Sequence, residues 1–91
     1  MILKEYIIMD PQGIHARPAA SLIKLTKNYK STFELKKDDK TVRLNSMLNI
    51  LSMGIKGGET IVVLIDGEDE VIAAEAIDSF FTELGKMIKN W

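Results

Sequence analysis

Thr60-Ile61-Val62-Val63-Leu64-Ile65 is a nearly continuous apolar run that is rich in β-branched residues. This pattern is typical of a strand at the centre of a sheet. Asp66-Gly67 follows with turn chemistry and ends the strand. We therefore expect this segment to form the middle of a β-sheet, with the rest of the chain arranged around it.

The segment after this turn predicts a helix. Apolar residues recur there at spacings of three and four, which is typical of a helix that buries one face. This stripe consists of Val71, Ala74, Ile77, Phe81, Leu84 and Ile88. Gly85 leaves open whether the helix continues past Leu84.

Three more strands are expected before the central run, because short stretches there are apolar or alternate between apolar and polar residues. They span residues 3–9, 32–36 and 41–44. The polar turn Asp38-Asp39-Lys40 joins the last two as a hairpin.

Two helices are expected between these strands. The first spans 16–29, where helical spacing places four residues on one face. They are Ala19, Leu22, Ile23 and Thr26. The second spans 46–54, with Ser46 as its N-cap and Gly54 as its C-terminal stop. The resulting order βαββαβα favours an α+β fold, with an antiparallel sheet that packs its helices on one face.

The composition of the chain limits the classes of protein to which it can belong. The chain has 91 residues, a formal net charge of −1, no cysteine and one histidine. We expect a single domain over residues 1–91, no disulfide and no metal site of thiolate or imidazole type. The charge gives no support for binding to nucleic acid. No apolar run is long enough to insert in a membrane and the N-terminus does not resemble a signal peptide, so a cytoplasmic location is expected.

The only histidine lies in Gly13-Ile14-His15-Ala16-Arg17-Pro18-Ala19-Ala20, where a helix is expected to begin. A neutral imidazole is a nucleophile, and the N–H groups at a helix start favour an added anion. A phosphoryl group suits such a site, and Arg17 supplies a permanent positive charge for it. A lone histidine before a helix is more often an ordinary surface residue, but that reading leaves the rest of the octapeptide without a role.

The octapeptide resembles the active-site signature of HPr, the family of histidine-containing phosphocarriers of the bacterial sugar phosphotransferase system. The resemblance covers essentially the whole chain, since length and element order fit as well. It implies an open-faced β-sandwich, with a four-stranded antiparallel sheet and three helices on one side. It also implies that His15 takes a phosphoryl group on Nδ1 from phospho-enzyme I and passes it to the IIA domain of a sugar permease. Arg17 would hold the phosphoryl oxygens, and the protein would be a carrier without a cofactor rather than an enzyme.

Ser46 and the apolar residues after it resemble a second, regulatory signature of the same family. The resemblance implies phosphorylation of Ser46 by HPr kinase/phosphorylase and binding of that form to catabolite control protein A. Asn45 and Asn49 depart from the lysine and glycine common in Gram-positive members, as do Gln12 and Ala20 from the residues usual at their positions. The alternative function is a mainly regulatory paralogue that acts as a transcriptional co-repressor through phospho-Ser46, but the presence of His15 favours the carrier.

The resemblance also implies that partners dock beside His15. Met47, Leu48 and Leu51 form a candidate apolar patch, and Lys24 and Lys27 are candidates for attracting acidic partner faces. Because one small carrier must present the same face to several partners, we expect a monomer. A generic interaction domain without any phosphorylation is the third class of function, and it does not account for the octapeptide.

Overall fold

The computed structural model describes the fold of residues 1–89 and the side chains of residues 1–84. Its elements follow the predicted order βαββαβα. They are β1 (Ile2–Ile7), α1 (Ala16–Thr26), β2 (Thr32–Lys37), β3 (Lys40–Arg43), α2 (Met47–Ser52), β4 (Thr60–Asp66) and α3 (Glu70–Lys89). The predicted α+β fold, an open-faced sandwich of one antiparallel sheet and three helices, is confirmed.

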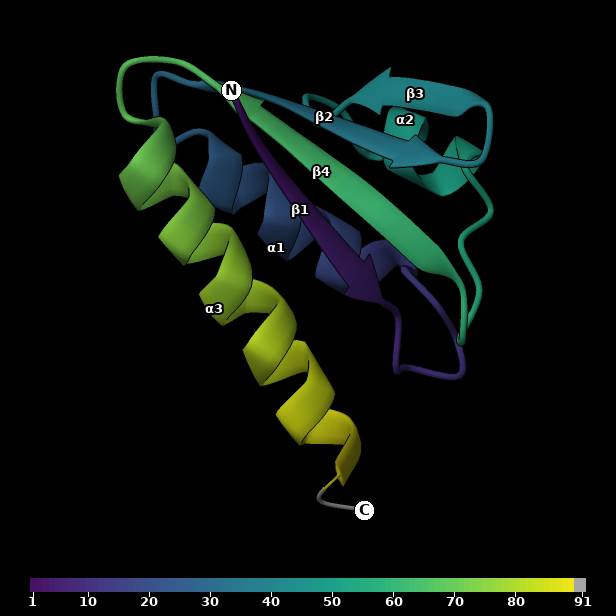
Figure 1. The fold of residues 1–91 in the computed structure, drawn as a ribbon. Helices are drawn as coiled ribbons and strands as arrows, with labels where there is room; N and C mark the ends of the chain where they lie inside the picture. The colour runs from purple at the N-terminus through teal and green to yellow at the C-terminus, as the bar shows by residue number, and fades with distance from the viewer. Residues whose placement is uncertain (90–91) are drawn as a thin grey trace.

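The sheet has the strand order β1-β4-β2-β3, and every neighbouring pair is antiparallel. The apolar run that the sequence places at the centre is β4, which pairs with both β1 and β2. Ile61, Val63 and Ile65 on β4 are fully buried, whereas the intervening Val62 and Leu64 are half-buried on the opposite face. Figure 1 shows α1 and α2 behind the sheet and α3 along its β1 side, so the face toward the viewer is open.

The core lies between the sheet and the helices. The face of α1 that the spacing predicts is buried, and Pro18 joins it. Ile50 of α2 and Ile77 of α3 reach the same core, each with about 1% or less of its surface exposed. Sequence periodicity was therefore sufficient to find the buried face of the first helix.

The observed element boundaries lie within two residues of the predicted ones except at the end of α1. Helix α1 ends at Thr26 rather than at residue 29, and Asn28 and Tyr29 form turn hydrogen bonds instead. Strand β1 ends at Ile7 rather than at residue 9, and the N–H of the next residue, Ile8, bonds the carbonyl of Glu59 just before β4. Helix α3 continues past Gly85 to Lys89, although the side chains beyond Leu84, including that of the predicted stripe residue Ile88, lie outside the described ones.

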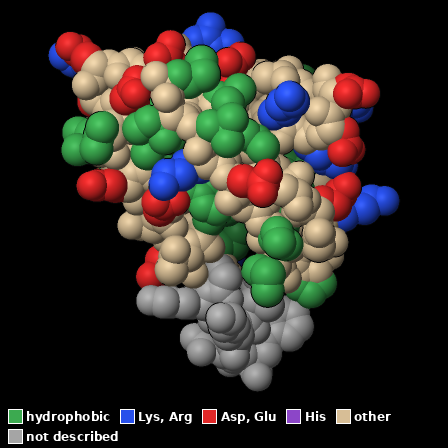
Figure 2. Space-filling model, viewed as in Figure 1, with side chains coloured by type: hydrophobic (Ala, Val, Ile, Leu, Met, Phe, Trp, Pro, Cys, Tyr) green, Lys and Arg blue, Asp and Glu red, His purple; other side chains and the backbone are tan. Residues whose placement is uncertain are grey.

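The open face of the sheet mixes apolar and charged side chains (Figure 2). Leu3 and Ile7 of β1 are the exposed apolar residues there, at 61% and 62% of their surface. Charged neighbours interrupt them, since Glu5 lies between them on the same face of the strand. Within the described part of the chain, no helix combines the length and the apolar character needed to span a membrane.

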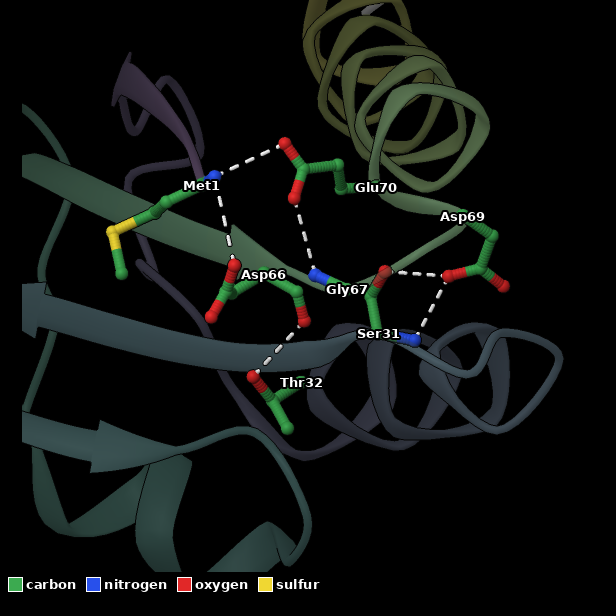
Figure 3. Close-up of polar contacts among 7 residues, drawn as sticks. All are labelled: Met1, Ser31, Thr32, Asp66, Gly67, Asp69 and Glu70. Carbon is green, nitrogen blue, oxygen red and sulfur yellow. Dashed lines mark hydrogen bonds and ion pairs between the residues drawn. The ribbon is translucent and has the colours of Figure 1, made fainter.

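A polar cluster fixes the end of the sheet at which β1 begins and β4 ends (Figure 3). The Asp69 carboxylate accepts hydrogen bonds from the N–H groups of Lys30 and Ser31, at 2.7 and 2.8 Å. Glu70 accepts one from the N–H of Gly67 at 3.1 Å and pairs with the amino group of Met1 at 3.1 Å. These contacts join the turn before α3 to the starts of β1 and β2, at the opposite end of the strands from the loop that carries His15.

Candidate functional site

His15 is the N-cap residue of α1. Its backbone is extended, with φ −97° and ψ −173°, and its side chain makes no capping hydrogen bond. The imidazole is 39% exposed, so a partner can reach it. The predicted position of the only histidine, at the start of the first helix, is confirmed.

The start of α1 leaves backbone donors beside this imidazole. The N–H groups of Ala16 and Arg17, the first two helical residues, have no acceptor within the helix. Pro18, the third helical residue, has no N–H, and the N–H of Ala19 bonds the carbonyl of His15 at 3.0 Å. Within the described part of the chain these two donors have no partner, and with the positive end of the helix dipole they lie beside the position that a phosphoryl group on His15 would take.

Asp10 is the charged side chain that the structure brings to His15. Its Oδ2 lies 3.4 Å from Nε2 of the imidazole. Its Oδ1 accepts a hydrogen bond from the N–H of Gln12 at 2.9 Å, and only 16% of the side chain is exposed. No sequence pattern singled out Asp10, although an aspartate that accepts from a backbone N–H two residues later is a common turn arrangement.

The loop that carries His15 is held by backbone contacts with the loop after α2. The N–H of Ile14 bonds the carbonyl of Ile55 at 3.3 Å, and Gly13 has φ +71°. A Cβ on Gly13 would lie 1.8 Å from the Ile55 oxygen, so only glycine fits there. Gly57 also faces Asp10 too closely for a side chain, since its Cβ would lie 2.6 Å from the Asp10 carbonyl oxygen. Two glycines thus allow the close approach that positions His15 and Asp10.

Lys37 of strand β2 holds the loop after α2 against the sheet. Its ammonium group donates to the carbonyls of Met53 and Gly54, each at 3.3 Å, where α2 ends. The same group lies 3.0 Å from the Glu59 carboxylate. The N–H of Lys56 and the Lys37 ammonium lower the pKa of Glu59, because both stabilise its ionised form. The loop behind His15 is therefore fixed from the strand side as well.

Arg17 is exposed on the first turn of α1. Among the described residues, its guanidinium has no hydrogen-bond or ion-pair partner. It is therefore available to turn toward an anion at the helix start, but the structure does not bring it into contact with the imidazole.

Ser46 is the N-cap residue of α2, as predicted. Its backbone is extended and its Oγ accepts a hydrogen bond from the N–H of Asn49 at 3.1 Å. The Asn49 side-chain amide donates to the Asn45 side chain and to the Arg43 carbonyl, each at 3.1 Å. The two asparagines that depart from the family pattern are therefore hydrogen-bonded to one another, and together they brace the turn that holds Ser46.

The predicted docking residues fall into two groups. Leu48 and Leu51 are exposed on one side of α2, at 78% and 42%, whereas Met47 is half-buried against the core. Lys24 and Lys27 are exposed toward the end of α1, nine and twelve residues after His15. At 1.5 Å per residue they lie about 14 and 18 Å along the axis, too far to reach a phosphoryl group on the imidazole. No group of three or more His, Cys, Asp or Glu side chains within the described residues is arranged to hold a metal ion.

Comparison with known proteins finds similarity to one family over nearly the whole chain. Residues 2–83 match the family model described as the PTS HPr component phosphorylation site. Phosphocarrier protein HPr of Lysinibacillus sphaericus is 34% identical over 85 residues, which cover 93% of this chain and 97% of the relative. Phosphocarrier protein HPr of Borreliella burgdorferi is 36% identical over 84 residues, which cover 88% and 98%.

Solved structures agree with this result. The histidine-containing phosphocarrier protein of a Mycoplasma has a TM-score of 0.88 and 32% identity, covering 92% of this chain and 96% of its own. HPr of Thermoanaerobacter tengcongensis has a TM-score of 0.87 and 28% identity, covering 94% and 97%. The fold is thus that of a phosphocarrier of the phosphotransferase system. The chain belongs to the HPr family.

Proposed function

We propose that this chain accepts a phosphoryl group on His15 from phospho-enzyme I and passes it to the IIA domain of a sugar permease. The observation that carries the proposal is the position of the half-exposed imidazole, which caps no helix N–H and lies beside two unused backbone donors. Phosphoryl transfer needs an acceptor, correct positioning and stabilisation of charge, and little other chemistry from the protein. Arg17 would add its guanidinium to the phosphoryl oxygens once the group has arrived.

Phosphorylation with phosphoenolpyruvate and enzyme I tests this proposal. We expect one acid-labile phosphate per chain, and its transfer to a IIA domain added afterwards. The His15→Ala variant should take up none, whereas Ser46→Ala should be phosphorylated like the wild type. Arg17→Ala should keep the fold, checked by circular dichroism, and slow the transfer. Acid-labile phosphate on the His15→Ala variant would overturn the assignment.

We also propose that HPr kinase/phosphorylase phosphorylates Ser46 and that this form binds catabolite control protein A. In support, Ser46 lies beside the exposed Leu48 and Leu51, so a phosphate there would change the charge at the edge of an apolar docking surface. The bracing of the turn by Asn45 and Asn49 is the feature that a kinase would have to accommodate. The neighbour Crh of Bacillus subtilis, whose structure is that of a catabolite repression protein, has a TM-score of 0.73 and 27% identity.

Incubation with the kinase and ATP, followed by mass spectrometry, separates the two candidate functions. A carrier with regulation at Ser46 gains phosphate at His15 from enzyme I and at Ser46 from the kinase. The alternative, a regulatory co-repressor module, gains phosphate at Ser46 alone. Absence of phosphoserine would contradict regulation at this residue and leave the carrier function as the remaining one.

The proposed carrier works as a monomer in the cytoplasm, where it meets several partners in turn. Two neighbours were solved as dimers, namely Crh by domain swapping and an HPr of Thermoanaerobacter tengcongensis. Sedimentation over a range of protein concentrations tests the expectation for this chain, and a dimer that persists on dilution would contradict it.

A further inference from the structure

We propose that Asp10 is a positioning residue for phosphoryl transfer, because its carboxylate accepts a hydrogen bond from the Nε2–H of His15 and so leaves the lone pair on Nδ1. This inference rests on the proposed function and concerns the same site. Its starting point is the 3.4 Å separation between Nε2 and Oδ2 of Asp10.

The Asp10 carboxylate is held in place before any partner arrives. Its Oδ1 accepts from the N–H of Gln12, and its carbonyl accepts from the N–H of Gly13 at 2.8 Å. The backbone of Gly57 packs against the same carbonyl, so the turn cannot relax in that direction. One carboxylate oxygen is thus occupied by the turn and the other is directed at the imidazole.

The chemistry of the two groups decides where the proton lies. An ionised carboxylate only accepts hydrogen bonds, and a neutral imidazole has one N–H and one nitrogen with a lone pair. A hydrogen bond to Asp10 therefore requires the proton on Nε2, which makes Nδ1 the nucleophile. The separation is long for such a bond, but hydrogen bonds at active sites often tighten only in the complex with the partner.

The transfer step then needs no proton to leave His15. The Nδ1 lone pair forms the new N–P bond while the bond between phosphorus and the donor breaks, and its electron pair returns to the donor. The ring keeps its Nε2 proton and becomes a phosphoimidazolium, whose positive charge strengthens the bond to the Asp10 carboxylate. On transfer to the acceptor the N–P bond breaks, its electron pair returns to Nδ1, and the starting tautomer is restored.

A purely structural role for Asp10 is the alternative, because the carboxylate also organises the turn. Asp10→Asn separates the two roles, since its amide oxygen can still accept from the N–H of Gln12 but carries no charge. Asp39→Asn is the matched control, as it removes the same charge from an exposed residue in the β2–β3 turn.

The test combines ¹⁵N NMR of the His15 ring nitrogens in mildly alkaline solution with transfer rates from phospho-enzyme I. In the wild type and Asp39→Asn, we expect the shifts of a single tautomer with the proton on Nε2. In Asp10→Asn the shifts should move toward a mixture of tautomers, and transfer should slow by about tenfold, the low end for a hydrogen bond to a charged group. Thermal unfolding should show that all three proteins remain folded.

Two results would overturn the inference. One is a wild-type spectrum with the proton on Nδ1, and the other is an Asp10→Asn variant that matches the wild type in both spectrum and rate. The spectra need no enzyme I, so they decide the contact between Asp10 and His15 even if the wild type takes up no phosphate. Absence of phosphate on the wild-type protein would instead contradict the proposed carrier function.

Discussion

Helices α1 and α2 both begin with an N-cap residue in extended conformation, yet they use its side chain in different ways. Ser46 accepts a hydrogen bond from the N–H of Asn49, so its hydroxyl stabilises α2. The His15 side chain caps nothing, and its imidazole lies next to Asp10 at the surface. One helix start is therefore closed by its own residue, and the other is left open.

The third helical residue explains the difference. An N-cap side chain accepts from the second or third helical N–H, and in α2 the third is that of Asn49. In α1 the third residue is Pro18, which has no N–H to offer. Pro18 thus removes the usual capping partner, while its ring belongs to the core beneath the helix. The difference shows that an uncapped helix start is specified in the sequence, and it leaves both the imidazole and the remaining N–H groups available to an anion.

Replacement of His15 by serine gives the largest expected effect, because it makes the first helix start resemble the second. We expect His15→Ser to lose all phosphorylation by enzyme I, since no imidazole remains. Its stability should rise by at most about 1 kcal/mol, because Pro18 leaves only the N–H of Arg17 for the new hydroxyl. Acid-labile phosphate and thermal unfolding measure the two effects. A large loss of stability would show that the imidazole supports the fold rather than the transfer.

Gly13→Ala should have the next largest effect, because it disturbs the loop that holds the open helix start. The new Cβ would lie 1.8 Å from the Ile55 carbonyl oxygen, on a residue with φ +71°. We expect a loss of at least about 2 kcal/mol and a melting temperature lower by 10 °C or more, on the order expected for a small domain. The rate at which enzyme I phosphorylates His15 should fall as well.

Gly54→Ala is the matched control for this prediction. Gly54 also has positive φ, at +59°, but a Cβ there meets nothing within 4 Å. The substitution should therefore cost only the conformational penalty, about 1–2 kcal/mol, and leave phosphorylation intact. Equal effects of the two substitutions would mean that the contact between Gly13 and Ile55 does not position His15.

Ser46→Ala tests the closed helix start. The loss of the capping hydrogen bond should cost about 1 kcal/mol and lower the melting temperature by about 4–8 °C. Ser21→Ala is the control, because Ser21 is exposed inside α1 and alanine is the better helix former. An unchanged melting temperature in Ser46→Ala would show that the bracing by Asn45 and Asn49 holds the turn without the cap.

Local patterns predicted the order and type of the elements, and they predicted the capped start of α2. The β-branched run of β4, the apolar face of α1 and the Ser46 cap all depend on neighbours in sequence, so spacing and residue type were enough. The site needed contacts that spacing does not specify. The bond from Ile14 to Ile55 and the cap of α2 by Lys37 join segments far apart in the chain. Asp10 is near His15 in sequence, but only the folded turn directs its carboxylate to the ring.

Helix α3 begins in a third way, with the carboxylates of Asp69 and Glu70, which titrate whereas a serine hydroxyl does not. The Ser31 hydroxyl and the N–H of Lys30 lower the pKa of Asp69 by stabilising its charge. The N–H of Gly67 and the amino group of Met1 lower the pKa of Glu70 in the same way.

The unfolded chain restores both carboxyls to their ordinary pKa values near 4, so in acid it binds more protons than the folded chain. The stability that these groups contribute is therefore complete above about pH 5 and is lost as the pH falls through 4 and below. We expect the melting temperature of the wild type to fall over this range, and that of Asp69→Asn to fall less steeply. Ser46→Ala should start lower and keep the wild-type slope, because its cap is insensitive to pH. An Asp69→Asn slope equal to that of the wild type would contradict a titrating start of α3.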